Sequence, residues 1–205
     1  GEQTELRLQR GNIRNTVTPA SNDDRTFRVF TPGAVAAVRG TEYYVSVDAG
    51  ETTRNEVVDG RVDVSARGTR PDVQAGFATL ARLDQPPIEP VPLLPAPAVE
   101  LAVTHEDVTA AWPTQADADS YWLEWYRQRD ALLLGQASLQ TGHWQQDLPV
   151  GDYRLLVRAV DENGLRGHES WTHFSIEPAP PVEPEKESKW DLWVFLGGAA
   201  LLLAL

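Results

Sequence analysis

Hydrophobic and polar side chains alternate along most of the first eighty residues, in short runs that end at turn residues. In "EYYVSVD" the side chains of Tyr43, Val45 and Val47 fall on one side of a strand, and those between them fall on the other. "NEVVDGRVDVSA" repeats the pattern around Asp59 and Gly60, a dipeptide that favours a tight β-hairpin. No window of a dozen residues has helical spacing, so we expect a domain of short strands.

A second region of alternating strands follows, with its own turn signals. The segments "VTAAW", "YWLEWY" and "YRLLVRA" are separated by the turn clusters "PTQADADS", "LPVGD" and "DENGLRG". Roughly eighty residues with this spacing predict a small antiparallel β-sandwich. The side chains expected to point into its core are Val108, Ala110, Trp112, Tyr121, Leu123, Trp125, Tyr153, Leu155, Val157 and Ala159.

Two proline-rich stretches divide the chain. "QPPIEPVPLLPAPA" holds six prolines in fourteen residues, and "EPAPPVEPEKES" combines proline with charge. Both compositions favour extended connections between domains. The sequence therefore predicts a β-domain at residues 1–84, a linker at 85–97, the sandwich at 98–178, a second linker at 179–189 and an apolar segment at 190–205.

The apolar segment, "KWDLWVFLGGAALLLAL", ends in fourteen apolar residues, 192–205. As a helix this run would be about 21 Å long, against roughly 30 Å for the hydrocarbon core of a bilayer. A buried core helix is the alternative, but a helix that is apolar all round has no visible core to enter here. We therefore expect a transmembrane anchor helix that is cut short at its C-terminal end, with Trp190 and Trp193 at the interface. The acidic flank before it favours the non-cytoplasmic side.

Composition narrows the range of functions. The chain has no Cys, so it can form no disulfide, thiolate nucleophile or zinc–cysteine cluster. Its net charge is −12, and residues 86–178 hold most of this charge, with 14 acidic and 5 basic side chains. The sequence shows no basic stripe that could neutralise phosphates, so nucleic acid is a poor partner. The acidic half should also repel anionic lipid head groups.

The stretch "AVAAVRGTEYYVSVD" changes character in the middle. Residues 34–38 are apolar on both faces, which suits a strand that is covered on both sides. Gly40 can adopt a positive φ or allow a close approach, so we expect a bend or bulge there. Arg39 would then point out of the layer, where it either pins the bend through a carboxylate or carbonyl, or contacts a ligand or partner. Thr41 is expected to hydrogen-bond to a local backbone group.

These residues resemble the FecR domain. The family pattern places Thr-Pro before an alanine and valine run, then Val-Arg-Gly-Thr, an aromatic strand, and a hairpin with valines around a glycine. The matching residues are Thr31, Pro32, Val38, Arg39, Gly40, Thr41, Tyr43, Tyr44, Val57, Gly60 and Val64. The resemblance covers about residues 5–83 and implies an all-β, solenoid-like domain of stacked strands outside the cytoplasmic membrane. It makes Arg39, Gly40, Thr41 and Tyr44 the candidate binding residues.

The order of segments differs from that of the founding FecR members. Those proteins sense siderophore-transporter occupancy and control a sigma factor, and they place a cytoplasmic anti-sigma segment and one membrane helix before the FecR domain. Here the FecR-like domain comes first and the apolar segment last, which fits FecR-like envelope proteins better. The second region is similar to fibronectin type III or related immunoglobulin-like modules, which implies that Trp112, Tyr121 and Tyr153 are core residues.

Few residues suggest chemistry. The four His do not form a metal set by sequence, and "DENG" lacks the alternating ligands and distal Glu of a calcium loop. The sequence contains no nucleophile elbow, phosphate loop or HExxH motif. We therefore expect no metal site, no cofactor and no catalytic residues. Trp122 and Tyr126 should face outward beside Leu156, either to bind a protein or glycan, or to rest under a loop or against the first domain.

The expected function is that of a non-enzymatic, membrane-anchored protein of the bacterial periplasm or cell envelope. Its FecR-like domain would sense or dock an envelope partner, such as a transporter, a signalling protein or a cell-wall protein. Two alternatives stay open at this point. One is a transmembrane regulator of the anti-sigma type, linked to siderophore or iron transport. The other is a module that binds glycan or peptidoglycan through Trp122 and Tyr126.

Overall fold

The computed structural model describes residues 3–17, 26–38 and 40–181. The apolar segment at 190–205, where the anchor helix is expected, lies outside these residues, and so does Arg39. Within the described ranges, no helix is long and apolar enough to cross a membrane.

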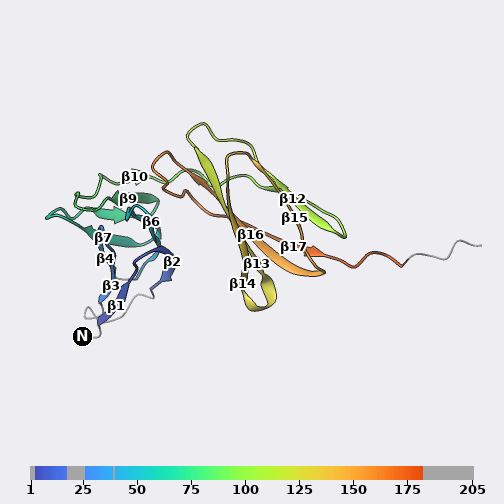
Figure 1. Ribbon diagram of the computed structural model, residues 1–205, viewed down its shortest axis with the longest axis horizontal. Helices are drawn as coiled ribbons and strands as arrows, with labels where there is room; N and C mark the ends of the chain where they lie inside the picture. Colours follow the sequence, from blue (N-terminus) through green and yellow to red (C-terminus); the bar gives the residue numbers. More distant parts are fainter. Residues whose placement is uncertain (1–2, 18–25, 39, 182–205) are drawn as a thin grey trace, which may run out of the picture.

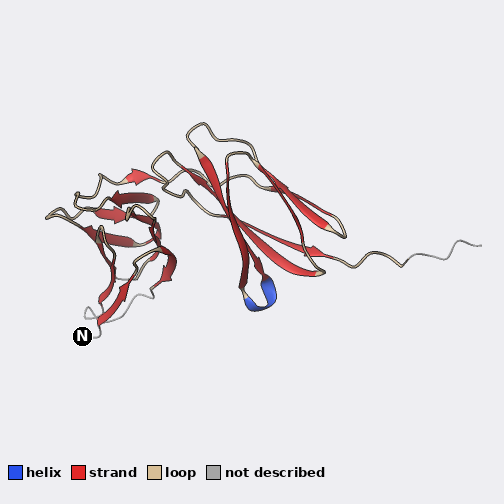
Figure 2. Cartoon of the chain, in the orientation of Figure 1, coloured by secondary structure: helices blue, strands red, loops and turns tan. Residues whose placement is uncertain are grey.

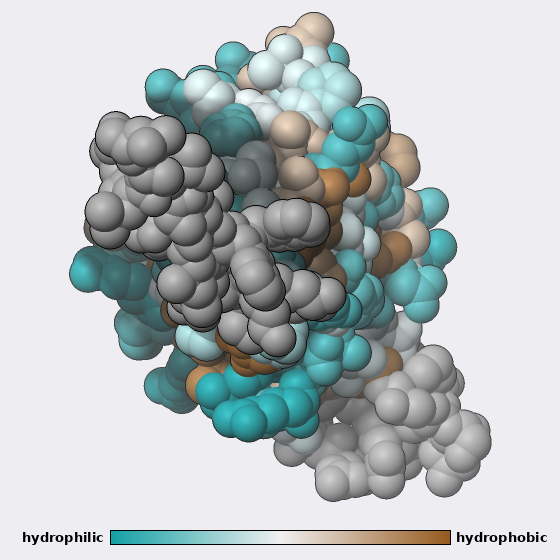
Figure 3. All heavy atoms as spheres, turned by 90° about the vertical axis from the view of Figure 1, so that its right-hand side faces the viewer, coloured by the Kyte–Doolittle hydropathy of each residue, from teal (hydrophilic) through white to brown (hydrophobic). Residues whose placement is uncertain are grey.

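The described chain is all-β, as predicted, and its strands gather into two regions (Figure 1). We call residues 3–92 the first region and residues 100–176 the second region. The helical content of the described part is a single short 3-10 turn, η1 (Gln128–Asp130), at the tip of a long hairpin (Figure 2). The side of the second region shown in Figure 3 is a mixture of hydrophilic and hydrophobic residues.

Two five-stranded sheets make up the first region. The first sheet has the order β1 (Gln3–Arg7), β3 (Thr26–Phe30), β4 (Val35–Val38), β7 (Arg61–Ser65) and β8 (Asp72–Gln74). The second has the order β10 (Val91–Pro92), β9 (Phe77–Ala81), β6 (Thr53–Asp59), β5 (Glu42–Val47) and β2 (Gly11–Thr16). Side chains from both sheets form one core between them, which includes Val29, Val38, Tyr43, Val45, Val57, Val62 and Val64.

The sequence pattern predicts a β-hairpin at Asp59 and Gly60, and this prediction is wrong. Strand β6 pairs with β5 and β9, whereas β7 pairs with β4 and β8, so the chain passes from one sheet to the other at Gly60. A positive φ is needed at this glycine in either case, and here φ is +82°. A corner between packed sheets therefore carries the same local signal as a tight hairpin.

Strand β4 is buried on one face, although its apolar sequence suggested cover on both. Ala36 and Val38 are 2% exposed and belong to the core between the sheets. Val35 and Ala37 point to the other face and are half-buried. Because the small side chains of Val35 and Ala37 expose little area, an apolar run can line an open sheet face here.

The second region is an antiparallel sandwich, as predicted. One sheet has the order β11 (Glu100–Val103), β12 (Asp107–Ala111) and β15 (His143–Asp147). The other has the order β14 (Leu132–Leu139), β13 (Ser120–Arg127), β16 (Gly151–Val160) and β17 (Ser170–Ile176). The expected core residues Trp112, Tyr121 and Tyr153 are all buried in it. Tyr153 also donates a hydrogen bond to the carbonyl oxygen of Pro149 at 2.7 Å.

The proline-rich stretch between the regions is extended but docked. Val91 and Pro92 pair with β9 as strand β10, and the Leu93 N–H donates to the carbonyl oxygen of Gly76 at 2.8 Å. On the other side, the His168 N–H donates to the carbonyl oxygen of Leu94 at 2.8 Å. The stretch is therefore bonded to both regions rather than acting as a free spacer.

Candidate functional site

The Gly-Thr of the predicted motif lies where the chain crosses between the two sheets of the first region. Gly40 has φ +68° and connects β4 of one sheet to β5 of the other. The Gly60 crossing lies beside it, because a Cβ on Gly60 would be 2.7 Å from the carbonyl oxygen of Gly40. The bend expected at Gly40 is thus present, as one of two adjacent crossings.

Thr41 joins the two crossings through its hydroxyl group. The hydroxyl donates to the carbonyl oxygen of Arg61 at 2.8 Å and accepts from the Arg61 N–H at 3.3 Å. The Thr41 side chain is 2% exposed. The backbone partner expected for Thr41 is therefore real, although it lies twenty residues away in sequence rather than nearby. These contacts give Thr41 a structural task.

Tyr44, the fourth candidate binding residue, is covered by the second region. Its side chain is 6% exposed, and its hydroxyl donates a hydrogen bond to the Glu169 carboxylate. The Arg158 guanidinium lies 4.2 Å from the centre of the Tyr44 ring. Burial and the hydrogen bond to Glu169 raise the pKa of the Tyr44 phenol above its usual range. Tyr44 is therefore a neutral donor inside an internal interface.

We call this interface the seam: it is the contact between the outer face of sheet β10-β9-β6-β5-β2 and the second region. Its apolar part is formed by Leu165, which is 3% exposed and packs in one cluster with Ala78, Leu80 and Leu93. Since Leu165 belongs to the β16–β17 connection, this loop reaches into the first region. Its burial supplies the hydrophobic contribution to the contact.

Polar bonds surround the apolar part of the seam. Arg54 Nε donates to the carbonyl oxygen of Asn163 at 2.8 Å. The Arg166 N–H donates to Oε1 of Glu56 at 3.2 Å, and Glu56 is 1% exposed. Burial is the largest influence on the Arg166 guanidinium and lowers its pKa. Each of these bonds crosses between the regions, so together they fix one relative orientation.

Arginines stack on aromatic rings along the seam. The Arg166 guanidinium is 3.9 Å from the centre of the Trp122 ring. Arg154 is 4.9 Å from the centre of Tyr126. Such cation–π contacts are strongest when water is excluded from them. Trp122 and Tyr126, the aromatic pair expected to face outward, therefore each have an arginine guanidinium against one face of the ring.

Glu124 is hydrogen-bonded to both Trp122 and Tyr126. Its carboxylate accepts a hydrogen bond from the Trp122 indole N–H at 2.8 Å and another from the Tyr126 hydroxyl. The structure thus brings Tyr44 and Tyr126 to one hollow beside the seam, whereas Gly40 and Thr41 lie at the sheet corner. Trp122 and Tyr126 are half-buried, and the arginine and glutamate side chains that contact them belong to the second region itself. Binding of a protein or glycan by this pair stays a prediction.

The seam residues that sequence reasoning missed are mostly charged. Arg158 is 1% exposed, and it donates to the carbonyl oxygens of Gly167 and Arg166 at 2.7 and 2.8 Å. Arg14 contacts Glu169 at 3.6 Å from the opposite side. A signal did exist, because Arg154 and Arg158 share one face of a strand whose other face is core. Arginines at alternate strand positions usually mark solvent, so this signal is ambiguous.

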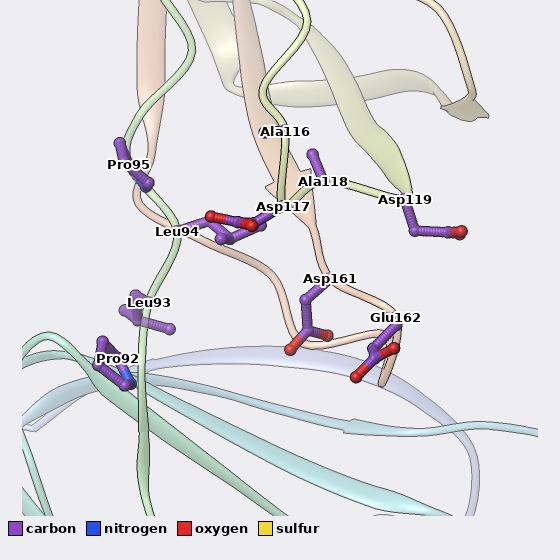
Figure 4. A pocket seen from close by; sticks show the side chains of 10 residues that line it. All are labelled: Pro92, Leu93, Leu94, Pro95, Ala116, Asp117, Ala118, Asp119, Asp161 and Glu162. Atoms are coloured by element: carbon purple, nitrogen blue, oxygen red, sulfur yellow. The ribbon is translucent and has the colours of Figure 1, made fainter.

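Two hollows lie beside the seam. One, of about 170 Å³, is lined by residues that include Arg14, Tyr44, Glu124 and Tyr126. The other, of about 800 Å³, opens between the docked proline-rich stretch and two loops of the second region (Figure 4). Its walls carry the carboxylates of Asp117, Asp119, Asp161 and Glu162. Throughout residues 3–17, 26–38 and 40–181, no group of His, Asp and Glu side chains is arranged to hold a metal ion.

The family comparison supports the resemblance seen in the sequence. Residues 1–63 match the family model described as FecR protein, which confirms the FecR resemblance for the N-terminal part of the chain. The match includes the Gly40 and Gly60 crossings and ends within β7. A comparison with curated proteins finds no match.

Three solved structures show distant similarity. One is a candidate anti-sigma factor from Parabacteroides distasonis, with 14% identity, a TM-score of 0.32, and coverage of 42% of this chain and 49% of that chain. The others are extracellular domains of a candidate one-component and a candidate hybrid two-component system from B. thetaiotaomicron, with 9% and 10% identity and TM-scores of 0.30 and 0.29. Each covers 80% of this chain, which spans 31% and 30% of their lengths.

Proposed function

We propose that the protein is a non-enzymatic component of the bacterial envelope, in which a periplasmic FecR domain senses or docks a protein partner. The match of residues 1–63 to the FecR family is the observation that carries this proposal. The apolar segment at 190–205 would anchor the chain to the membrane. The second region would hold the FecR domain at a fixed orientation away from that anchor.

The assignment of the second region as a spacer of the fibronectin type III kind rests on its topology. A three-stranded sheet packs against a four-stranded one, and every pair of neighbouring strands is antiparallel. The hydrogen bond from Tyr153 to the backbone of Pro149 resembles the tyrosine corner of immunoglobulin-like sandwiches. Such modules commonly separate or bind and rarely catalyse, which agrees with a spacer role.

Because the seam covers Tyr44, the docking surface of the first region is expected on its opposite side. Since Tyr44 is covered by the second region, the open face is that of sheet β1-β3-β4-β7-β8. Phe30, Val35 and Ala37 are half-buried on this face. Arg28 and Asp72 lie exposed around them. A small apolar centre with a charged rim is a common composition for a protein-binding surface.

Site-specific crosslinking in the native envelope tests this proposal. A photoreactive residue replaces Arg28 on the open face, and a matched variant carries it at the exposed His105 of the second region. We expect a crosslinked envelope protein from the Arg28 position and none from His105. Crosslinks to a transporter or sigma-linked protein would identify a regulator, and crosslinks to cell-wall proteins would identify a scaffold. Equal or absent crosslinking at both positions would contradict docking through this face.

A further inference from the structure

The β16–β17 connection carries the only Asn-Gly dipeptide of the chain, Asn163 and Gly164. Asparagine before glycine is especially prone to spontaneous deamidation, because glycine has no Cβ to shield its backbone nitrogen. The turn around the dipeptide, residues 161–165, includes Leu165 and so takes part in the seam; Figure 4 shows its Asp161 and Glu162. A chemically reactive dipeptide thus lies in a loop that joins the two regions.

Deamidation requires the peptide group between the two residues to turn. The Gly164 nitrogen loses its proton and bonds to Cγ of Asn163, and the bond from Cγ to the side-chain nitrogen breaks. That nitrogen leaves as ammonia with the released proton, and a cyclic imide remains. Water then opens the imide at either carbonyl, which gives aspartate or isoaspartate. In isoaspartate the main chain runs through the former side chain and is longer by one atom.

The folded protein holds this peptide group at both ends. Its N–H, on Gly164, donates to the carbonyl oxygen of Asp161 at 2.9 Å. Its carbonyl oxygen, on Asn163, accepts from Nε of Arg54 at 2.8 Å. Arg54 is in turn oriented by Asp48, whose Oδ2 lies 2.9 Å from Nη1. The Gly164 nitrogen therefore cannot turn toward Cγ while these bonds hold, and the bond to Arg54 crosses the seam.

The contact with Arg54 also explains why the reactive glycine is needed. A Cβ on Gly164 would lie 2.9 Å from Nε of Arg54, and φ at Gly164 is +75°. Both the close approach and the backbone conformation therefore favour glycine. The residue that lets the loop lie against the first region is the same residue that makes the dipeptide reactive.

The loop must lift from the first region before the peptide group can turn. Leu165 directly follows the dipeptide and is 3% exposed in its apolar cluster. The next residue, Arg166, donates its N–H to Oε1 of Glu56 at 3.2 Å. Because the reaction needs these contacts and the Arg54 bond to separate, its rate follows the population of the open form.

Isoaspartate at position 163 does not fit the closed turn. The Asp161 side chain accepts from the N–H groups of Asn163 and Leu165 at 2.9 and 2.8 Å. The Asp161 N–H donates to the carbonyl oxygen of Leu165 at 3.0 Å. An extra main-chain atom lengthens the chain between these bonds and displaces Leu165 from its apolar cluster. The burial that stabilises the seam is then lost.

We propose that Asn163 is a deamidation site that the closed seam protects, and that its conversion to isoaspartate prevents the seam from closing again. The opening runs in one direction, because water does not return the carboxylate to an amide. The modification requires no partner protein and no cofactor, since water is the only other reactant.

Ageing of the full chain in detergent micelles tests the protection. Peptide mapping by mass spectrometry measures isoaspartate at position 163, in buffer and in urea that unfolds the chain. We expect formation in buffer to be slower by at least about tenfold, since only the open fraction reacts. Arg54→Lys keeps the charge but removes the Nε donor, so it should accelerate formation several-fold. Arg70→Lys, at an exposed side chain paired with Asp63, is the matched control and should keep the wild-type rate.

Equal rates in buffer and in urea would overturn the protection, and so would an Arg54→Lys rate equal to that of the wild type. Leu165→Ser opens the seam through its apolar part and should also accelerate formation, which gives a second route to the same result. Near-ultraviolet circular dichroism checks that each variant is folded before ageing.

Calorimetry separates the effect of the longer main chain from that of the new charge. Chains with isoaspartate at position 163 are purified after ageing and compared with Asn163→Asp, which keeps the normal main chain. We expect two transitions from the isoaspartate chain and one from Asn163→Asp. One transition in both would overturn the loss of closure. Two transitions in both would assign the opening to the charge and overturn the role of the longer main chain.

Discussion

Thr41, which directly precedes β5 of one sheet, is hydrogen-bonded through its hydroxyl group to β7 of the other sheet. Its hydroxyl both donates to and accepts from the backbone of Arg61, so one side chain satisfies both the carbonyl and the N–H of that residue. Within the motif, Thr41 therefore has a structural role in the fold.

Removing the Thr41 hydroxyl should destabilise the protein. Thr41→Val keeps the shape of the side chain but leaves the Arg61 N–H and carbonyl without this partner, so we expect a loss of about 1–3 kcal/mol in the free energy of unfolding. Thr41→Ser keeps the hydroxyl and should lose clearly less. Urea denaturation of both variants measures the difference, and equal losses would show that the hydroxyl is not what matters.

Asp48 is expected to make the folding stability of the first region depend on pH in the acid range. Burial raises the pKa of this carboxyl, but the hydrogen bonds from Arg54 at 2.9 Å and from the N–H groups of Gly50 and Thr52 outweigh burial and lower it. A lowered folded-state pKa contributes stability above about pH 4, and this contribution is lost as the pH falls through the folded pKa. The stability advantage of the wild type over Asp48→Asn should therefore shrink from pH 5 downward. An advantage that is constant across a series of urea titrations from pH 5 to strong acid would contradict this assignment.

At the scale of strands, the glycine corners decide the architecture. The sequence pattern predicts strands in both regions and the inward faces of β5, β13 and β16, because alternation is a local property. It does not show which strands share a sheet. At Gly60 the local signal for a hairpin and for a corner is identical, and only the pairing of β7 with β4 distinguishes them.

The corner predicts unequal costs for two glycine substitutions. Gly60 and Gly68 both have positive φ, +82° and +79°, but a Cβ on Gly68 would meet nothing within 4 Å. Gly68→Ala should therefore cost only the backbone term of about 1–2 kcal/mol. Gly60→Ala should cost about 1–3 kcal/mol more, because its Cβ would lie 2.7 Å from the carbonyl oxygen of Gly40. Thermal unfolding of the pair measures the difference, and similar melting temperatures would rule out the close approach.

The whole molecule is organised by the seam, whose pairs of contacting residues could not be predicted from the sequence. Its partners are far apart in the chain: the hydrogen bond between Tyr44 and Glu169 spans 125 residues. No spacing rule connects such positions, and an outward-facing Tyr or Trp looks the same whether it meets a partner or another part of its own chain. Tyr44 was thus identified from the sequence, while the surface of the second region that covers it was not.

The seam predicts that the two regions unfold together. Leu165 packs on Ala78, Leu80 and Leu93, and Leu165→Ser would place a hydroxyl in this apolar contact. We expect the variant to lose coupling, so that one calorimetric transition divides into two. Val150→Ser, at a side chain that is 61% exposed, is the matched control and should keep the single transition. A single transition in both variants would show that the regions are coupled by other contacts.

The 125-residue span between Tyr44 and Glu169 also has a consequence in time. A ribosome adds about 5–20 residues per second, so roughly 6–25 s pass between the synthesis of one partner and that of the other. During this interval the Tyr44 face of the first region has no second region to cover it. The newly made chain therefore exposes the Tyr44 face of this sheet to solvent. We expect a chaperone that binds exposed aromatic side chains to act during this interval.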